Sequence, residues 1–403
     1  MTIPTTLART WLEIDLDRLA ANTAAVGRHV GGAERILATV KADAYGHGVV
    51  FCARAFVEAG VGWLGVATVE EGVEIRRAGL RAPVLVLSPI GVDEVAASAA
   101  HGLSITVSSV VYIEEIARVA TQGRIGVHIG IDTGMGREGA LPEEASALIR
   151  RAYSIPELRV EGVFTHFPSA DEGERAFTLG QLERFEAILN TAGVAGEPLL
   201  RHAANSAGVL DFPESHLDLV RPGLLLYGLY PSGAVSRTVR VDPVLAFKSR
   251  VTHIKRIPAG HPVSYGRRFH AERPTEIACV AVGYADGFSR RLSCERGEVL
   301  IDGRRHPVIG SVTMDQILVK LDGDSSVDVG DPVVLIGEDG AESIDVIEMA
   351  AIRETIPWDV LTGIGPRVPR IYLREGVRVG ARTLLGRRSF EKGAEEDVRD
   401  SRA

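Results

Sequence analysis

The feature that most constrains the fold is an alternation that runs from Trp11 to about Gly228. Short, apolar, strand-like runs alternate there with amphipathic stretches that are rich in alanine and glutamate and have helical period. This alternation is typical of βα units, in which helices cover a parallel sheet. Eight such units in about two hundred residues predict an α/β fold of the (β/α)8 TIM barrel type, whose active site lies at the carboxyl ends of the strands.

The predicted barrel elements are short and follow one another closely. A doubly wound sheet is the structural alternative, but it does not explain why polar residues follow so many of the strands. The strands are expected at 36–40, 62–67, 83–87, 103–107, 125–131, 160–165, 199–203 and 219–226, and helices between them at 17–29, 68–78, 109–120 and 174–190.

A second domain is expected after the barrel, which we place at 1–242. From 243 to 390 the chain has short β-rich runs broken by Gly, Pro and Asp, which predicts a mostly β domain with one helical stretch near 343–354. A strand near 9–15 is expected to pack with this β domain. The polar residues 391–403 are expected to form a disordered tail. Two domains also fit the length of 403 residues.

The overall charge argues against nucleic acid and anionic membranes as partners. The net charge is −8, from 45 Lys and Arg against 53 Asp and Glu, and charged residues make up 24% of an ordinary composition. A small metabolite is the expected ligand. The start of the chain lacks a signal-like segment, and no stretch is apolar for the length of a membrane span, so we expect a cytoplasmic protein.

The cysteines support the same compartment. Cys52, Cys279 and Cys294 are odd in number, far apart and not in CxxC pairs. This pattern argues against a disulfide framework and against a thiolate metal site, and we expect no bound metal.

Lys41 is the first candidate for chemistry. It stands where the apolar run 36–40 ends and a Gly-rich turn begins, with Tyr45 and His47 close by. An amine at the end of a buried strand is partly desolvated, and desolvation favours the neutral form that can condense with an aldehyde or accept a proton from carbon. A lone lysine at a strand end more often extends to solvent, so its partners along the chain must decide.

Arg221 is the second candidate, because it starts an otherwise apolar strand and a buried arginine needs acceptor atoms. A structural ion pair with Asp218 or Asp242 is one interpretation, and a guanidinium that faces a ring nitrogen or a phosphate is the other. Ser206 and Gly223 follow the last two strands, where barrels often bind phosphate.

Five further residues lie beside turns between apolar stretches. Arg137 follows three glycines that let the backbone approach a ligand, where a cation suits a carboxylate or a phenolate oxygen. Taken singly, each of the five is compatible with solvation or packing, and a tyrosine acts as a base only with a cation or histidine beside it. They are Arg137, His166, Tyr265, Tyr284 and Met314.

Six separated motifs closely resemble the alanine racemase family. They are VKADAYGHG, HAANSAG, VRPGLLLYGLYPS, VSYGR, GYADGF and TMDQ, in this order. The resemblance covers almost the whole chain, from RTWLEIDLDRLAAN to GIGPRVPRIY at 363–372. It implies a barrel that holds pyridoxal 5′-phosphate, a β domain, and a homodimer with active sites at the interface.

The resemblance also implies a two-base mechanism that interconverts L-alanine and D-alanine and supplies D-alanine for peptidoglycan. Lys41 then holds the cofactor covalently and is the base for the D enantiomer, and Tyr265 of the other subunit is the base for the L enantiomer. Racemisation needs two bases on opposite sides of one Cα, and this pair supplies them.

The remaining roles are carried over in the same way. Arg221 faces the pyridine nitrogen, and His166 supports Tyr265 and Arg221. Arg137 and the backbone N–H of Met314 bind the substrate carboxylate. The implied phosphate contacts are Tyr45, Ser206, Gly223, Leu224 and Tyr284.

Two positions depart from the family pattern. Many members carry a carbamylated lysine that orients the substrate-binding arginine, whereas this chain has Gly130 there. Arg137 must then be oriented by Asp132, by another side chain or by a bound anion, and no carbamate is expected. Trp358 stands in TIPW where the family commonly reads TINY, which removes a hydroxyl and adds bulk near the substrate.

Three alternative functions stay open. A racemase of the same fold could act on serine, lysine or ornithine. A pyridoxal phosphate binding and homeostasis protein shares the barrel and the lysine but has no β domain. A fold-type III decarboxylase would release carbon dioxide and is built around different motifs.

Overall fold

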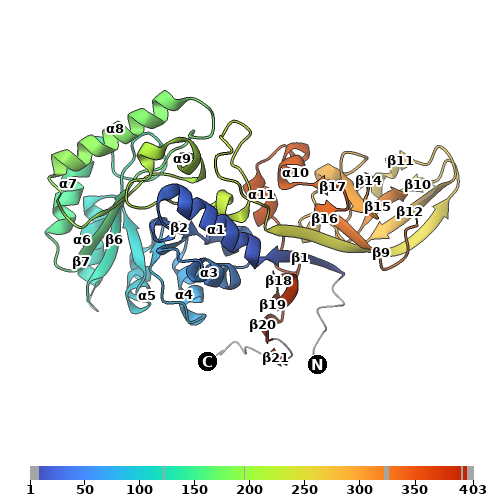
Figure 1. The fold of residues 1–403 in the computed structure, drawn as a ribbon, viewed down its shortest axis with the longest axis horizontal. Coiled ribbons are helices and arrows are strands. Elements are labelled where there is room, and N and C mark those ends of the chain that lie inside the picture. The colour runs from blue at the N-terminus through green and yellow to red at the C-terminus, as the bar shows by residue number, and fades with distance from the viewer. Residues whose placement is uncertain (1–8, 121–122, 195, 322–325, 392–393, 397–403) are drawn as a thin grey trace. The chain divides into compact units, whose positions relative to one another are not determined.

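The computed structural model describes residues 9–120, 123–194, 196–321, 326–391 and 394–396. The chain divides into two compact units. The barrel unit comprises Arg18–Ala44 and Val49–Asp242, and the β unit comprises the described residues of Met1–Asp17, Tyr45–Gly48 and Pro243–Ala403. Each unit is described by itself below (Figure 1).

The barrel unit contains a curved parallel sheet whose strands follow chain order. All residues of β2, β4, β5 and β6 are buried, as expected for parallel strands that are covered on both faces. The strands are β2 (Leu37–Thr39), β3 (Trp63–Val66), β4 (Val84–Val86), β5 (Ser104–Val107), β6 (Ile125–Gly130), β7 (Leu158–Phe164) and β8 (Leu200–His202).

The eighth predicted strand, 219–226, is not a full strand. Leu219 forms a single parallel bridge with His202 at the end of β8, and Val220 forms one with Ile36 beside β2, so only these two residues close the sheet. Pro222 has no N–H to donate and stops the ladder. The chain then turns into the 3₁₀ helix η5 (Leu224–Tyr227).

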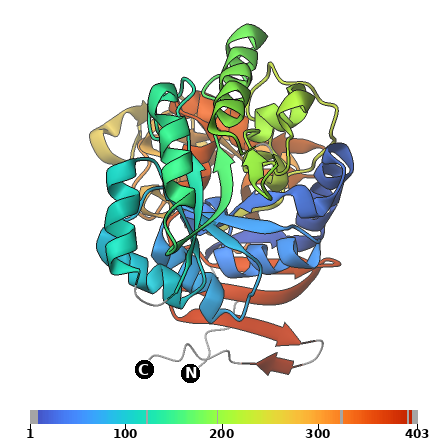
Figure 2. The same cartoon turned by 90° about the vertical axis from the view of Figure 1, so that its left-hand side faces the viewer.

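Helices cover the outer face of this sheet (Figures 1 and 2). Several begin at a side-chain cap: the hydroxyl of Thr68 accepts from the N–H of Glu71 before α4, and Ser109 caps α6 in the same way. The helices are α1 (Leu16–Val30), α3 (Val49–Glu58), α4 (Val69–Arg77), α5 (Val95–Ala100), α6 (Val110–Val119), α7 (Pro142–Tyr153), α8 (Arg175–Ala192) and α9 (Ser206–Asp211), with short 3₁₀ turns at η2 (Ala33–Arg35), η3 (Val92–Glu94) and η4 (Pro213–Ser215).

The described part of the β unit is built on one twelve-stranded sheet of order β17-β16-β13-β14-β15-β12-β9-β1-β18-β19-β20-β21. β1 (Thr10–Asp15) lies inside this sheet, antiparallel to β9 (Leu245–Ile257) and parallel to β18 (Arg370–Arg374). The other strands are β12 (Thr275–Val280), β13 (Glu298–Ile301), β14 (Arg304–Ile309), β15 (Ile317–Leu321), β16 (Pro332–Asp339), β17 (Glu342–Ile344), β19 (Val377–Thr383), β20 (Gly386–Glu391) and β21 (Ala394–Glu396).

Short elements decorate this sheet. A hairpin of β10 (Pro262–Val263) and β11 (Phe269–His270) carries the 3₁₀ turn η6 (Tyr265–Arg267). The helix expected near 343–354 is α10 (Val346–Arg353), and α11 (Pro357–Thr362) follows it with proline in its first turn. The remaining 3₁₀ turns are η7 (Tyr284–Asp286) and η8 (Arg290–Leu292).

The predicted fold class is confirmed: an α/β unit with a parallel sheet precedes a mostly β unit. The expected tail differs in the part that can be seen, because Ala394–Glu396 pairs with β20 as a strand. Residues 392–393 and 397–403 lie outside the described residues.

Candidate active site

Lys41 opens α2 (Lys41–Tyr45), which is a turn of left-handed helix. Residues 42–45 all have φ between 51° and 56°. Each non-glycine residue in this conformation costs roughly 1–2 kcal/mol, so four in a row need support from elsewhere. Glu71 supplies part of it, because its carboxylate accepts a hydrogen bond from the N–H of Ala42 at 2.7 Å. The turn fixes the backbone immediately after the lysine.

The amine of Lys41 is partly desolvated, as the sequence predicts. Burial lowers its pKa, and the nearby charges of Arg137 and Arg221 lower it further. Glu71 and Glu138 act in the opposite direction without reversing the shift. A larger share of this amine is therefore neutral and nucleophilic than in an ordinary lysine.

Arg221 is 6% exposed, and all its recorded contacts are with neutral acceptors. Nη1 contacts Nδ1 of His202 at 2.7 Å, and Nη2 donates to the carbonyls of Thr165 at 2.6 Å and Ala203 at 3.1 Å. Nη2 also contacts Nδ1 of His166 at 3.2 Å. Burial, assisted by Arg137, lowers the pKa of Arg221 to about 9.

The ion-pair interpretation of Arg221 is wrong for both suggested partners. Asp218 pairs with Arg201, whose Nε lies 2.7 Å from its carboxylate. Asp242 lies 3.9 Å from Arg240. Within the described residues the buried guanidinium of Arg221 therefore has no anionic partner, which favours a ligand with an acceptor atom.

A chain of two further histidines extends from Arg221. Because a guanidinium only donates, Nδ1 of His202 accepts, and Nε2 of His202 must carry the proton that it donates to Nδ1 of His128 at 2.8 Å. Burial and the charge of Arg221 lower the pKa of His128 to about 3 and that of His202 well below its usual range. Both rings are neutral at neutral pH, and Nε2 of His128 has no partner among the described residues.

His166 is neutral for the same reasons. Burial first, and then the charges of Arg221, Arg137 and Lys41, lower its pKa to about 3. Its Nδ1 therefore accepts from Arg221. The structure brings four of the predicted residues together in the barrel unit: Lys41, Arg137, His166 and Arg221.

Three of the predicted phosphate contacts form one cradle. The hydroxyl of Ser206 accepts from the N–H of Gly223 at 3.0 Å and from that of Leu225 at 3.3 Å. Leu224 lies between them at the start of η5 and is buried. Because the oxygen of Ser206 accepts both bonds, its own proton is available for a ligand.

Asp132 does not contact the side chain of Arg137. Its carboxylate accepts the backbone N–H groups of Gly134, Met135 and Gly136 at 2.8, 2.7 and 2.9 Å, so it shapes the loop. Arg137 is exposed, and its side chain makes no hydrogen bond or ion pair with any residue that the structure describes.

Gly130 leaves little space for a longer side chain. A Cβ added there would lie 3.3 Å from the ring of Phe164. That ring stacks on His202 with centroids 5.0 Å apart and lies 5.2 Å from the guanidinium carbon of Arg221. The position where many family members carry a lysine therefore borders a ring that packs against Arg221.

In the β unit, Tyr45 is buried and hydrogen-bonded to Trp358. The indole N–H can only donate, so the hydroxyl oxygen of Tyr45 accepts. Burial nevertheless raises the pKa of Tyr45, which keeps the hydroxyl protonated and able to donate onward. Trp358 removes a hydroxyl, as the sequence indicates, but it contributes a donor of its own.

Tyr265 is presented outward from a fixed backbone. Its side chain is 75% exposed, and its hydroxyl makes no hydrogen bond within the described residues. The hydroxyl of Ser311 donates to the carbonyl of Tyr265 at 2.8 Å, and the hydroxyl of Ser264 donates back to the carbonyl of Ser311 at 2.6 Å. Val263 and Ile309 belong to the apolar cluster beneath this hairpin.

Tyr284 and Met314 lie on two loops that are hydrogen-bonded to each other. The N–H of Tyr284 donates to the carbonyl of Thr313 at 3.0 Å, and that of Ala285 to the carbonyl of Met314 at 3.1 Å. The side chains of Tyr284 and Met314 are 42% and 51% exposed. As with Tyr265, the backbone is fixed by hydrogen bonds and the side chain is exposed to solvent.

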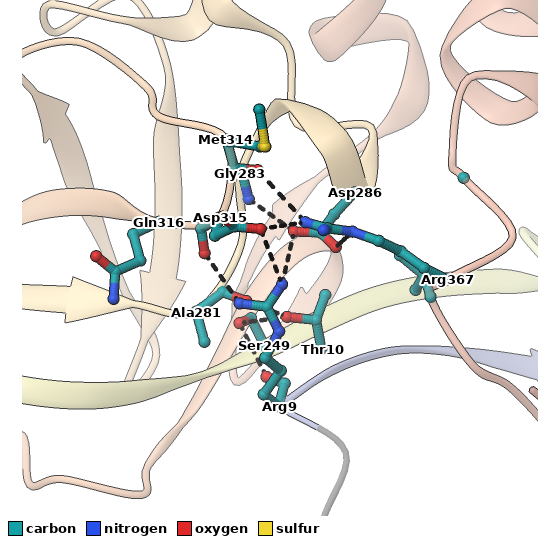
Figure 3. A network of polar contacts seen from close by, with 12 residues as sticks. Arg9, Thr10, Ser249, Ala281, Gly283, Asp286, Met314, Asp315, Gln316 and Arg367 are labelled. Carbon is teal, nitrogen blue, oxygen red and sulfur yellow. Dashed lines mark hydrogen bonds and ion pairs between the residues drawn. The ribbon is translucent and has the colours of Figure 1, made fainter. Parts of the chain in front are cut away.

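A network of charges supports these loops (Figure 3). The buried carboxylate of Asp286 accepts from the N–H of Gly283 at 2.9 Å and pairs with Nε of Arg367 at 2.7 Å. Arg367 also pairs with Asp315 at 2.8 Å, and Arg9 reaches both carboxylates at 3.5 and 3.7 Å. The two arginines join both loops to segments at opposite ends of the chain.

Comparison with known proteins decides the family. The family model for the alanine racemase N-terminal domain matches residues 14–231, and the model for the alanine racemase C-terminal domain matches residues 244–372. This chain belongs to the alanine racemase family. The alanine racemase of Symbiobacterium thermophilum is 46% identical over 90% of this chain and 97% of its own length, and that of Halothermothrix orenii is 40% identical over 90% and 96%.

Solved alanine racemases have the same fold. The enzyme of Clostridium difficile 630 is 34% identical with a TM-score of 0.89, and covers 95% of this chain and 99% of its own. The enzyme of Bacillus anthracis with bound L-Ala-P is 36% identical with a TM-score of 0.88, at 94% and 98% coverage. That of Bartonella henselae, with covalently bound pyridoxal phosphate, is 28% identical with a TM-score of 0.82, at 91% and 100% coverage.

The motifs that resemble the alanine racemase family did not include every residue that the structure ties to the site. His128 lies outside those motifs in a strand-like run, and its only sequence signal was a histidine where an apolar residue is expected. His202 is the first residue of HAANSAG, but the sequence analysis gave it no role. Asp286 lies in GYADGF and Arg367 in GIGPRVPRIY, but the two are far apart in the sequence and no local pattern predicts that they pair. Among the described residues, no helix is long and apolar enough to cross a membrane.

Proposed function

We propose that this chain, a member of the alanine racemase family, interconverts L-alanine and D-alanine with pyridoxal 5′-phosphate as cofactor. The main observation is that a desolvated amine, Lys41, lies near two arginines, Arg137 and Arg221, which have no acidic partner among the described residues. Such a site attracts an anionic carbonyl compound and offers it a nucleophile.

The residues of the barrel unit fit the cofactor. Arg221 provides a buried donor whose recorded partners are all neutral, which suits a ring nitrogen. Ser206, Gly223 and Leu224 provide a hydroxyl and backbone for the phosphate, and Tyr45 and Tyr284 are proposed as its further contacts. When bound, pyridoxal 5′-phosphate stabilises the electron pair left at Cα when the substrate loses a proton.

Two bases then move the proton. Lys41 would hold the cofactor when no substrate is bound, and its amine, free of the cofactor once the substrate is bound, would exchange a proton with Cα of D-alanine. Tyr265 of the partner subunit exchanges a proton with Cα of L-alanine from the opposite face. The exposure of Tyr265 in this chain, 75%, supports a role toward a second copy in a homodimer.

Arg221 sets the reactivity of the cofactor ring. It keeps its own proton, so it does not protonate the ring nitrogen, and the weaker electron withdrawal disfavours transamination. His166 is neutral and accepts from Arg221, which holds the guanidinium in place and leaves the histidine available to support Tyr265.

The substrate is held by its carboxylate. Arg137 is a cation close enough to Lys41 to lower its pKa, and it has no acidic partner among the described residues. The N–H of Met314 from the partner subunit is the proposed second donor. The product D-alanine would serve peptidoglycan synthesis, and the three free cysteines suit the reducing cytoplasm.

The face assignment is tested with Tyr265→Phe. Exchange of the Cα hydrogen with solvent deuterium is followed from each enantiomer. We expect exchange from L-alanine to be lost and exchange from D-alanine to survive. Tyr153→Phe, at an exposed tyrosine of the barrel unit, is the control and should change neither rate. Survival from L-alanine with loss from D-alanine would reverse the assignment.

A second candidate is a racemase of the same fold for serine, lysine or ornithine. The observation that favours testing it is Trp358, which binds Tyr45 through its indole N–H where the family commonly has a tyrosine. A panel of L-amino acids assayed for D-product separates the two. The match of the C-terminal family model over 244–372 argues against a homeostasis protein, which lacks that domain.

A further inference from the structure

The loop that carries Arg137 is held from one side by helix α8. A Cβ added to Gly134 would lie 3.0 Å from Cζ of Phe177, and 3.5 Å from both Nε2 of Gln181 and Nη2 of Arg184. These three residues are spaced four and three positions apart on α8 and therefore share one face of it. The loop thus packs directly on a continuous stripe of that helix.

Gln181 binds this loop through its amide nitrogen. Nε2 donates to Oγ1 of Thr133 at 3.2 Å and to the carbonyl of His166 at 3.2 Å. The hydroxyl of Thr133 also pairs with that of Thr165 at 2.7 Å. Gln181 is 0% exposed and Thr133 is 2% exposed, so these bonds are sheltered from water.

The backbone of the loop is bound at the same point. Nε of Arg184 donates to the carbonyl of Thr133 at 3.0 Å. The N–H groups of the next three residues, 134–136, are bound by Asp132. The segment before Arg137 is therefore fixed through both its backbone and its side chains, whereas the guanidinium of Arg137 has no partner of its own among the described residues.

The amide oxygen of Gln181 indicates that packing is not its only task. Oε1 is buried and has no hydrogen-bond partner among the described residues. An unsatisfied buried oxygen is unfavourable, and an apolar side chain of similar size would avoid it. What an apolar side chain could not supply is the pair of bonds from Nε2.

We propose that Gln181 is a positioning residue for substrate binding: together with Arg184 it fixes Thr133 and so sets where Arg137 leaves the loop. Many family members orient this arginine through a lysine side chain, and Gly130 offers none. The inference rests on the proposed role of Arg137 at the substrate carboxylate. It also accounts for the exposed arginine, because the backbone directs it instead of a side-chain partner.

The test is Gln181→Met, which keeps the volume and removes both bonds. We expect KM for L-alanine and D-alanine to rise about tenfold while kcat stays within about twofold, because ground-state binding of the carboxylate weakens in both directions. Ser146→Ala is the matched control, since it removes a buried bond of 3.3 Å from α7 to the carbonyl of Ile188 on α8. It should leave KM unchanged.

A double-mutant cycle with Arg137→Gln separates the possible outcomes. If Arg137→Gln raises KM and Gln181→Met adds nothing to it, both roles stand. If Arg137→Gln raises KM and Gln181→Met alone does not, or if the two effects simply multiply, the positioning role of Gln181 is overturned and that of Arg137 stands. If Arg137→Gln leaves KM unchanged, both fall.

Arg184→Met is the second variant, for the case in which Gln181→Met does not fold. It removes the bond to the carbonyl of Thr133 and leaves the side chain of Gln181 in place. We expect the same rise in KM with an unchanged kcat. A lowered melting temperature with unchanged KM, in a variant that folds, would mean that the stripe on α8 only stabilises the barrel unit.

Discussion

The two units present their functional residues in opposite ways. In the barrel unit Arg137 is exposed, but the other arginine is buried and bound to its neighbours: Arg221 is 6% exposed and contacts three side-chain or backbone partners through one nitrogen. In the β unit the corresponding side chains are free at their tips, with Tyr265, Met314 and Tyr284 at 75%, 51% and 42% exposure. The barrel unit thus sets the protonation states of its side chains, and the β unit holds a backbone from which exposed side chains extend.

This difference follows from what each group must do. A buried guanidinium or imidazole has its protonation state set by desolvation and by fixed neighbours, so it must be enclosed. A tyrosine or a backbone N–H that serves a second subunit must be accessible, and only its backbone can be fixed in advance. The serine pair beneath Tyr265 and the arginines beneath Met314 do this.

Replacement of Lys41 gives the largest expected effect. Lys41→Ala should lower racemisation by about 10⁴-fold, because both the covalent attachment and one base are lost. Lys41 is the only lysine of residues 1–242, so borohydride reduction followed by peptide mapping should find the cofactor on this residue alone. Lys255→Ala, at an exposed lysine of the β unit, should retain full activity. Label on any other lysine would contradict the proposal.

Loss of Arg367 should remove the support that fixes the exposed loops of the β unit. Arg367→Met leaves the carboxylate of Asp286 buried without its partner at 2.7 Å, which should cost about 3 kcal/mol of unfolding free energy. The loops of Tyr284 and Met314 lose their support, so racemisation should fall about tenfold. Denaturant unfolding and steady-state kinetics measure both effects.

The exposed pair of Arg291 and Glu354 provides the control for this prediction. Arg291→Met removes an ion pair at the surface, where water screens the charges, and should lower the unfolding free energy much less than Arg367→Met does. Equal losses in the two variants would mean that the burial of Asp286 is of no consequence.

The pH dependence of unfolding free energy tests whether the histidines of the barrel unit are buried in their neutral form. The pKa values of His128 and His166 are about 3 in the folded protein and about 6.5 in an unfolded chain. Between these values the unfolded state binds more protons, so stability is complete above pH ~6.5 and falls as pH drops. Each histidine contributes about 1.4 kcal/mol per pH unit.

His128→Asn isolates one of these protons, because the amide oxygen can accept from His202 as Nδ1 does. The slope of unfolding free energy against pH, measured between pH 6 and 4 by denaturant titration, should become shallower by about one proton. His253→Asn, at an exposed histidine, should leave the slope as it is. An unchanged slope for His128→Asn would show that the ring is not buried in its neutral form.

The smallest effect is expected at Trp358. Trp358→Phe removes the indole donor to Tyr45 and should weaken cofactor retention by about fivefold, near 1 kcal/mol. Trp11→Phe removes a comparable bond of 2.9 Å to Glu13 in the same unit and should not affect the cofactor. Spectroscopic titration of apoenzyme with pyridoxal 5′-phosphate measures both variants.

The sequence predicted the elements that are determined by local residue pattern. Short apolar runs located seven strands of the barrel unit to within a few residues, and the polar residues after them indicated the candidate site. The eighth strand was overestimated because Leu224–Tyr227 is as apolar as a strand, although Pro222 had already ended the ladder.

Features that depend on distant partners could not be predicted. Asp286 and Arg367 are 81 positions apart in the sequence. Asp218 pairs with Arg201 and not with Arg221, and this choice depends on how β8 meets the two bridges that close the sheet. The left-handed turn at 42–45 has three alanine and aspartate residues where glycine would be expected, so propensity argues against it.

That turn also keeps Lys41 from joining a continuous helix with α3. To relax into an ordinary helix, residues 42–45 would all have to change the sign of φ, and both routes, through 0° or through large positive φ, cross regions that are sterically disfavoured for non-glycine residues. Small shifts of α3 therefore cannot be passed to the lysine by gradual winding of the backbone. The left-handed turn therefore keeps the backbone of Lys41 distinct from that of α3.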